Sequence, residues 1–212
     1  MLQTELPQTR EAFVKEISPN PEVLARLDVY AQLLIRWQRR INLIGNSTIG
    51  ELWGRHFLDS AQLLRHLPKS ANNLTDIGSG GGFPGLILAV LVAGSGGPTV
   101  TLIESDSRKA AFLREVNRIC EANAEILNAR VENADLIPAD VVTARACAPL
   151  RKLLPLVKRC VRPDGVGLLM KGARWRDELT GLGKGWKMQV VVLPSLTDTS
   201  SVILKMEGFD LN

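Results

Sequence analysis

Residues 74–90 read LTDIGSGGGFPGLILAV, and this stretch decides the fold. A short β-rich run, LTDI, leads into a glycine loop, and an apolar helical segment follows from Pro84 to Val92. In an open α/β sheet, ligands bind in the crevice beyond the carboxyl ends of the strands, and glycines let a ligand approach the backbone closely. The sequence therefore predicts a ligand site at residues 76–84.

The spacing of the glycines separates two classes of cofactor. A dinucleotide fingerprint would need glycine at position 83, where this chain has Phe83. The loop instead follows the pattern Asp-x-Gly-x-Gly-x-Gly, which favours S-adenosylmethionine. On the loop alone, a nucleotide-binding dehydrogenase and other α/β proteins stay open as alternatives. The residues that carry the pattern are Asp76, Gly78, Gly80 and Gly82.

Six more β-rich runs follow, with helical stretches between them. The last two runs are separated only by PSLTDTS, which is too short for a helical crossover, so we expect antiparallel neighbours there. This arrangement predicts an α/β fold of the Rossmann-like class I methyltransferase type, with a seven-stranded, mostly parallel sheet and an antiparallel last strand. The expected strands are 74–77, 100–104, 125–127, 140–144, 166–170, 188–193 and 201–205. The expected helices of this part are 84–92, 108–122, 150–160 and 176–182.

Residues 1–70 are expected to form an N-terminal helical extension that packs on a main domain at 71–212. Asn20 and Pro21 fit a helix cap and a first helical position. Thr48 and Glu51 fit a capping box that would open a second helix. The apolar stripe of the first of these helices comprises Val23, Leu27, Tyr30, Leu34 and Trp37.

Composition limits the class of protein. The 212 residues contain no apolar run long enough for a membrane span, and the charged N-terminus lacks the apolar region of a secretory signal, so we expect a cytoplasmic protein. Three scattered cysteines and two histidines have no metal-ligand spacing, which predicts reduced thiols and no metal site. A net charge of +4 permits a nucleic-acid partner without requiring one.

Two further positions fit the cofactor. Glu104 ends the second expected strand, where a carboxylate can accept hydrogen bonds from ribose hydroxyls. A solvated strand end is the structural alternative, and Asp106 is a competing carboxylate. Val131 and Glu132 follow the third strand and would flank the adenine.

The fourth strand ends in TARACAP at 143–149, where the methyl acceptor is expected. The segment lacks the Asp/Asn-Pro-Pro-aromatic sequence of many enzymes that methylate exocyclic amines. Cys147 could be a nucleophile for cytosine methylation, but no Pro-Cys or Thr-Cys dipeptide surrounds it, so a packed thiol is favoured. Guanine N7 suits such a site because its lone pair carries no proton and needs positioning only. Arg145 fits either a ligand contact or a salt bridge.

The chain resembles the ribosomal RNA small subunit methyltransferase G family, also called glucose-inhibited division protein B, nearly from end to end. WQRRINL at 37–43 and RHFLDS at 55–60 are the most specific matches, and 76–85, 108–109, 112–113 and 145–146 add to them. Two positions depart from the family pattern: Cys147 replaces a usual Phe, and Glu104 replaces the Asp of some members.

The resemblance implies a monomeric enzyme that methylates guanine N7 at one loop position of 16S ribosomal RNA, using S-adenosylmethionine. It does not indicate whether the substrate is the 30S subunit or an assembly intermediate. The residues that it assigns to the cofactor are Gly78, Phe83, Val131, Glu132 and Arg145. No catalytic residue is certain, and the candidates for shaping the site are His56, Asp59 and Arg145.

The expected substrate is a loop or an extruded base, because the deep, narrow major groove of A-form RNA hides guanine N7. A methyltransferase for a small molecule or protein, and a non-catalytic domain that binds cofactor or RNA, are the alternatives. The main candidates for RNA binding are Arg39, Arg40, Arg55, Lys171 and Arg174. Other basic residues that could contact phosphates are Arg36, Arg176, Lys184 and Lys187.

Overall fold

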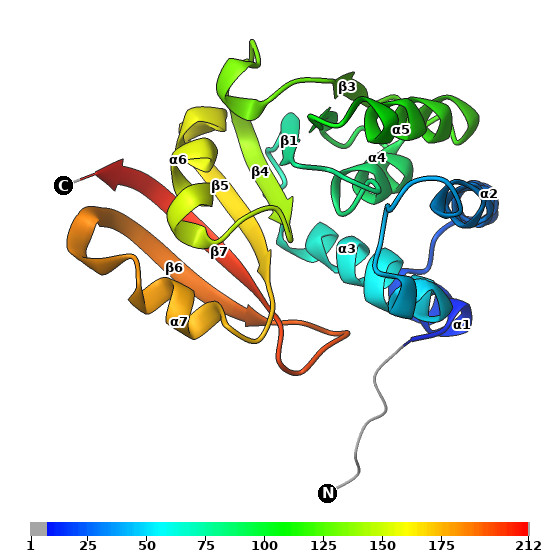
Figure 1. Cartoon of the computed structure of the whole chain (residues 1–212), viewed down its shortest axis with the longest axis horizontal. Coiled ribbons are helices and arrows are strands. Elements are labelled where there is room, and N and C mark those ends of the chain that lie inside the picture. The colour runs from blue at the N-terminus through cyan, green and yellow to red at the C-terminus, as the bar shows by residue number, and fades with distance from the viewer. Residues whose placement is uncertain (1–7, 212) are drawn as a thin grey trace, which may run out of the picture.

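The computed structural model describes residues 8–211; the first seven residues, part of the charged N-terminal stretch, lie outside this range. A seven-stranded sheet has the order β3-β2-β1-β4-β5-β7-β6 (Figure 1). β7 is antiparallel to both β5 and β6, and the other pairings are parallel, which confirms the predicted fold class. The strands are β1 (Asn73–Ile77), β2 (Thr99–Ile103), β3 (Glu125–Leu127), β4 (Ala139–Arg145), β5 (Val161–Lys171), β6 (Trp186–Pro194) and β7 (Val202–Leu211).

Helices cover both faces of the sheet because side chains alternate along each strand. Val141 packs into the apolar core formed with α4 (Gly85–Val92) and α5 (Ser107–Ile119). Its neighbour Val142 packs into the core formed with α6 (Leu150–Cys160), against which α7 (Trp175–Thr180) also lies. These four helices agree with the predicted positions.

Two strands are longer than predicted: β5 begins at Val161 instead of 166, and β7 runs to Leu211 instead of 205. Among the helices, the largest difference is the end of α5, which comes three residues before the predicted Ala122. Glu121 and Asn123 adopt left-handed backbone conformations, with φ of 48° and 54°, and these end the helix. The short turn η5 (Gly183–Gly185) then leads into β6. No helix in the described part of the chain is long and apolar enough to cross a membrane.

The N-terminal region is helical, as predicted. The Asn20 side chain accepts a 2.8 Å hydrogen bond from the Val23 amide, so Asn20 caps the second helix. The apolar stripe of this helix is buried except at Trp37, which is partly buried. The elements of the region are α1 (Arg10–Ile17), α2 (Pro21–Gln38), η1 (Asn46–Glu51), η2 (Trp53–Leu58), α3 (Asp59–Ala61) and η3 (Gln62–His66).

The predicted capping box at Thr48 and Glu51 is wrong. Thr48 lies inside the 3₁₀ turn η1, and its hydroxyl donates to the Gly45 carbonyl at 2.8 Å instead of capping a helix. The chain then passes into the π-helical turn η2 before a short α-helix. A contact with His56 explains the difference, because it holds the Thr48 hydroxyl at 2.8 Å from the imidazole Nε2.

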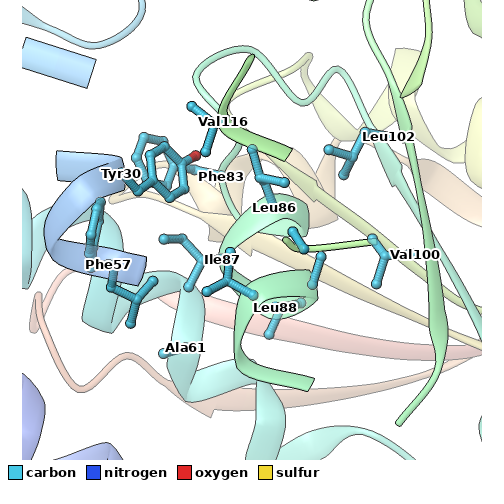
Figure 2. Close-up of a cluster of buried hydrophobic side chains, with 14 of the residues drawn as sticks. Tyr30, Phe57, Ala61, Phe83, Leu86, Ile87, Leu88, Val100, Leu102 and Val116 are labelled. Carbon is cyan, nitrogen blue, oxygen red and sulfur yellow. The ribbon is translucent and has the colours of Figure 1, made fainter. Parts of the chain in front are cut away.

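The helical extension and the sheet share one apolar core. Tyr30 and Phe57 of the extension pack beside Phe83 and α4 (Figure 2). The Tyr30 hydroxyl, which is buried, donates a 2.6 Å hydrogen bond to the carbonyl of Gly81 in the glycine loop. The division of the chain at residue 70 stays a prediction, and the extension contacts the loop directly.

Replacing Tyr30 with phenylalanine should therefore lower stability and loosen the glycine loop. The Gly81 carbonyl would lose its buried partner, which costs about 1–3 kcal/mol. Urea unfolding measures the loss, and cofactor titration followed by tryptophan fluorescence measures the effect on binding. Thr101→Val, which removes an exposed hydroxyl, is the control. Equal stability of Tyr30→Phe and the wild type would show that the hydrogen bond contributes nothing.

Candidate active site

Two neighbouring cavities lie at the carboxyl ends of the central strands. The loop cavity, about 460 Å³, is lined by Gly78, Val131 and Glu132 together with residues after β2 and at the start of α6. The η2 cleft, about 280 Å³, lies between η2, the end of β5 and the β6–β7 loop. One segment separates them: Arg145 and Ala146 line the η2 cleft, whereas residues 147–148 line the loop cavity. A group bound in either cavity therefore lies next to this wall.

The glycine loop has little room for side chains at the cavity wall. Gly78 has a φ of 68°, and a Cβ on it would lie 2.6 Å from the Cys147 sulfur. Asp76 lies beneath the loop, fully buried, and lines neither cavity. Its Oδ1 accepts a 2.7 Å hydrogen bond from the Thr143 hydroxyl, whereas its Oδ2 is buried with no partner within residues 8–211. Burial raises the pKa of Asp76 to about 6.

Glu104 braces the glycine loop from the end of β2. Its Oε2 accepts a hydrogen bond from the Gly80 amide at 2.8 Å, and its Oε1 accepts one from the Asp106 amide at 2.7 Å. Asp106, the competing carboxylate, caps α5 by accepting from the amides of residues 108 and 109. The contact of Glu104 with a ribose stays a prediction, and each carboxylate oxygen keeps a lone pair for it.

The other predicted cofactor residues are divided between surface and interior. Val131 and Glu132 begin η4 (Val131–Asn133) and face the loop cavity with Gly78. Phe83 is buried and lines neither cavity. Its ring supports Arg145 instead, with the guanidinium carbon 5.0 Å from the ring centroid. Direct cofactor contacts of Phe83, Gly80 and Gly82 stay predictions.

Arg145 contacts both of the other residues expected to shape the site, His56 and Asp59. Its Nη1 donates to the Arg55 carbonyl at 2.9 Å and to Asp59 Oδ2 at 3.2 Å. Its Nη2 contacts His56 Nδ1. Because a guanidinium can only donate, Nδ1 must accept, so the imidazole proton lies on Nε2 and points to the Thr48 hydroxyl. The Thr48 hydroxyl in turn donates to the Gly45 carbonyl, so each donor and acceptor in this series of hydrogen bonds has a partner.

His56 is uncharged in this arrangement. Burial, followed by the positive charges of Arg145 and Arg55, lowers the pKa of His56 to about 3. A folded-state pKa below the unfolded value means that the unfolded chain binds the extra proton first, so stability is lost as the pH falls below 6.5 towards 3.

We expect this proton uptake to destabilise the wild type by about 2 kcal/mol between about pH 7.5 and pH 5, relative to a His56→Asn variant. Asparagine offers Arg145 an acceptor but does not titrate. Urea unfolding of both proteins at the two pH values gives the difference. Parallel pH dependence of the two proteins would mean that His56 titrates alike in the folded and unfolded states.

The β6–β7 loop closes the η2 cleft, and sequence reasoning missed it. Asp59 Oδ1 accepts hydrogen bonds at 2.8 Å from both the Thr197 hydroxyl and the Gln62 amide. Asp198 Oδ2 accepts from Arg55 Nη1 at 2.9 Å. The only signal in the sequence was the hydroxyl-rich composition of PSLTDTS, which gives no information about its partners far away in the chain.

The predicted RNA-binding residues are in different environments. Lys171 donates to the Ala148 carbonyl and pairs with Glu178 at 2.7 Å, with 8% of its side chain exposed, so little of it is available to a phosphate. Arg55 lines the η2 cleft. Arg39, Arg40 and Arg174 are exposed and have no carboxylate partner among the described residues.

Comparison with known proteins identifies the family. A family model described as rRNA small subunit methyltransferase G matches residues 23–203. This chain belongs to that family. The ribosomal RNA small subunit methyltransferase G of Rhodospirillum centenum is 50% identical over 185 residues, covering 87% of this chain and 84% of the relative. That of Gluconobacter oxydans is 46% identical over 188 residues, covering 89% and 95%.

Solved structures that resemble this methyltransferase G family member agree on the fold. An O-methyltransferase from Bacillus cereus, in complex with SAH, has a TM-score of 0.57 and 14% identity, covering 92% of this chain and 95% of that one. A SAM-dependent methyltransferase from Aquifex aeolicus has a TM-score of 0.56 and 15% identity, covering 83% and 97%. At these identities the likeness concerns the fold alone.

The departure from the methyltransferase G pattern at Cys147 lies on the wall between the cavities. The thiol packs towards Gly78 in the loop cavity. Cys147 is exposed as a residue, but partial desolvation of its thiol, followed by the negative charges of Asp76 and Glu104, raises the pKa of Cys147. A protonated thiol is a poor nucleophile, so this environment argues against covalent attack on a cytosine.

Proposed function

We propose that this member of the methyltransferase G family transfers a methyl group from S-adenosylmethionine to N7 of a guanine at one loop position of 16S ribosomal RNA. The observation that supports this acceptor is the absence of a free general base among the described residues of the η2 cleft. Asp59 forms an ion pair with Arg145, which would be broken if Asp59 took up a proton, and both nitrogens of His56 have partners. Each oxygen of Asp198, the other carboxylate of the cleft, accepts two bonds. An acceptor that must lose a proton would find no base here.

Guanine N7 needs no such base. Bound S-adenosylmethionine supplies an electrophilic methyl group, which the N7 lone pair takes as the C–S bonding pair returns to sulfur, and no proton is released. The protein must then hold the base next to the wall of residues 145–148. Arg145 is fixed there by Asp59, His56 and the Phe83 ring, so this wall is rigid before substrates bind.

The loop cavity suits the cofactor. Its volume of about 460 Å³ lies within the range of sites for small ligands. Val131 and Glu132 would flank the adenine, and Glu104 would bind the ribose hydroxyls. Gly78 leaves the wall flat enough for the ligand to approach.

The proposal also includes the assembly state of the RNA substrate and the compartment in which the enzyme acts. The exposed arginines Arg39, Arg40 and Arg174 are available for phosphates. The 30S subunit or an assembly intermediate would present the RNA loop to a monomeric enzyme in the cytoplasm, where ribosomes are assembled.

The test is transfer of a labelled methyl group from S-adenosylmethionine to 30S subunits from cells that lack this protein, followed by nucleoside analysis of the 16S RNA. We expect label in 7-methylguanosine at one position. Folded, cofactor-binding protein that leaves the RNA unlabelled would refute the RNA assignment and direct attention to a small-molecule or protein acceptor.

The single-turnover rate of this transfer should be constant between about pH 7 and pH 9, because neither His56 nor the acceptor atom exchanges a proton in that range. Rapid-quench measurements with saturating cofactor check this expectation. A rate that rises about tenfold per pH unit would instead reveal an acceptor that must be deprotonated.

A further inference from the structure

The η2 cleft offers hydrogen-bond donors rather than acceptors to a bound base. The carboxylate of Asp198 accepts four bonds: from the Arg55 guanidinium, the Ser201 hydroxyl, and the amide and hydroxyl of Ser200. Asp59 Oδ1 likewise accepts two bonds at 2.8 Å, and its Oδ2 is paired with the Arg145 guanidinium. A cleft of this kind suits the edge of a base that carries acceptors. Guanine presents two acceptors, N7 and O6, on one edge, whereas adenine presents an acceptor and a donor.

Of the cations that line this cleft, Arg55 has the most donors to spare. Arg145 spends its terminal nitrogens on the Arg55 carbonyl, Asp59 and His56. Lys171 is held by Glu178 and a carbonyl. The Arg55 side chain is 40% exposed, and within residues 8–211 the sole acceptor for its guanidinium is Asp198, on one nitrogen. Four of its five N–H groups therefore remain for a ligand.

Asp198 fixes the direction of the Arg55 side chain. The serine bonds hold the carboxylate in place within the β6–β7 loop, and the guanidinium is bound to it at 2.9 Å. An arginine held in this way loses less conformational freedom when it binds a base. Asp198 is thus a positioning residue, acting through Arg55.

We propose that Arg55 donates a hydrogen bond to O6 of the target guanine and thereby makes the η2 cleft selective for a 6-oxopurine. This inference rests on the proposed function. Donation to O6 fixes the ring and leaves the neighbouring N7 lone pair free for the methyl group. Contact of Arg55 with an RNA phosphate is the competing role, and the two roles differ in what they predict for substrate analogues.

The test uses 30S subunits reconstituted with 16S RNA that carries guanine, inosine or 2-aminopurine at the position that the wild type labels, introduced by splinted ligation. Inosine keeps O6 and N7, whereas 2-aminopurine keeps N7 and lacks O6. We expect the wild type to methylate guanine and inosine alike, and 2-aminopurine about tenfold to a hundredfold more slowly. Arg55→Ala should slow guanine to the rate of 2-aminopurine and leave the 2-aminopurine rate unchanged.

Two variants and a control complete the experiment. Arg55→Lys keeps the charge beside Asp198 and should lose part of the preference for O6. This variant serves as the test if Arg55→Ala does not fold. Asp198→Asn should lose part of the same preference for O6. Combined with Arg55→Ala in a double variant, it should reduce the rate on guanine little further. Arg65→Ala removes an arginine of similar exposure, paired with Glu16 outside the cleft, and should behave as the wild type.

The outcomes separate the inference from the function on which it rests. A higher KM, a smaller salt dependence and an unchanged preference for O6 in Arg55→Ala would assign Arg55 to a phosphate and overturn the inference alone. Behaviour like that of Arg65→Ala would overturn it as well. An absence of label from wild-type enzyme on guanine-containing subunits would refute the proposed function, and the inference with it.

Discussion

Replacing Arg145 with methionine is expected to slow methyl transfer by about a hundredfold or more and to destabilise the protein by about 3–5 kcal/mol. The side chains of Arg145 and Asp59 are 17% and 15% exposed, so the variant would leave a largely buried carboxylate without its cation. The wall between the two cavities would also lose its bonds to His56 and to the Arg55 carbonyl. Urea unfolding and single-turnover transfer at saturating cofactor measure the two effects separately.

Arg145→Lys is the matched variant. Lysine keeps a positive charge near Asp59 but cannot also bind His56 with a second nitrogen in the same geometry. We expect it to recover most of the stability and a smaller part of the rate. Arg145→Met with wild-type turnover would show that the wall has no part in the transfer, whatever its effect on stability.

Replacing Asp76 with asparagine should have the opposite effect on stability. Burial holds the pKa of this carboxyl at about 6, so ionising it in the folded protein costs free energy at pH 8. The amide of the Asp76→Asn variant carries no charge, and we expect this variant to stabilise the cofactor-free protein by about 2 kcal/mol at about pH 8. Cofactor affinity should fall about tenfold, because the buried negative charge beneath the glycine loop no longer attracts the sulfonium.

The sign of the pH dependence tests this cause. A raised carboxyl pKa gives stability that is present below the unfolded value near 3.8 and is lost as the pH rises through about 6. The stability that Asp76→Asn gains over the wild type should therefore nearly disappear at about pH 4. Asp164→Asn, at a carboxylate whose side chain is 78% exposed, serves as the control and should change stability little at either pH. An advantage of equal size at both pH values would point to packing rather than charge.

The sheet could be predicted because its signals are local. Strands such as 166–170 appear as short apolar runs, and the seven residues of PSLTDTS exclude a crossover before the last strand. Asn20 and Pro21 marked the start of α2 for the same reason, since a cap depends on residues three positions apart. The family resemblance, carried by two N-terminal segments, is confirmed by the family model.

The cleft could not be predicted in the same way, because long-range contacts build it. Asp59 binds Thr197 across 138 positions of the chain, and Arg55 binds Asp198 across 143. The capping box failed for a related reason: Thr48 fitted the motif, but its hydroxyl is held by a histidine. Roles of individual residues towards cofactor and RNA remain predictions for the experiments above.

The contact of Tyr30 with the glycine loop limits how this sequence can change over evolution. A methyl group on Gly82 would collide with the Tyr30 hydroxyl, and the backbone there has a φ of 93°. A substitution at Gly82 would require a smaller residue at position 30, which would leave the Gly81 carbonyl without its donor, and a shift of Leu86, whose Cβ would lie 2.9 Å from the new Cβ. Because the backbone conformation also disfavours any side chain at this position, we expect related enzymes to have kept Gly82 through evolution, and Tyr30 with it.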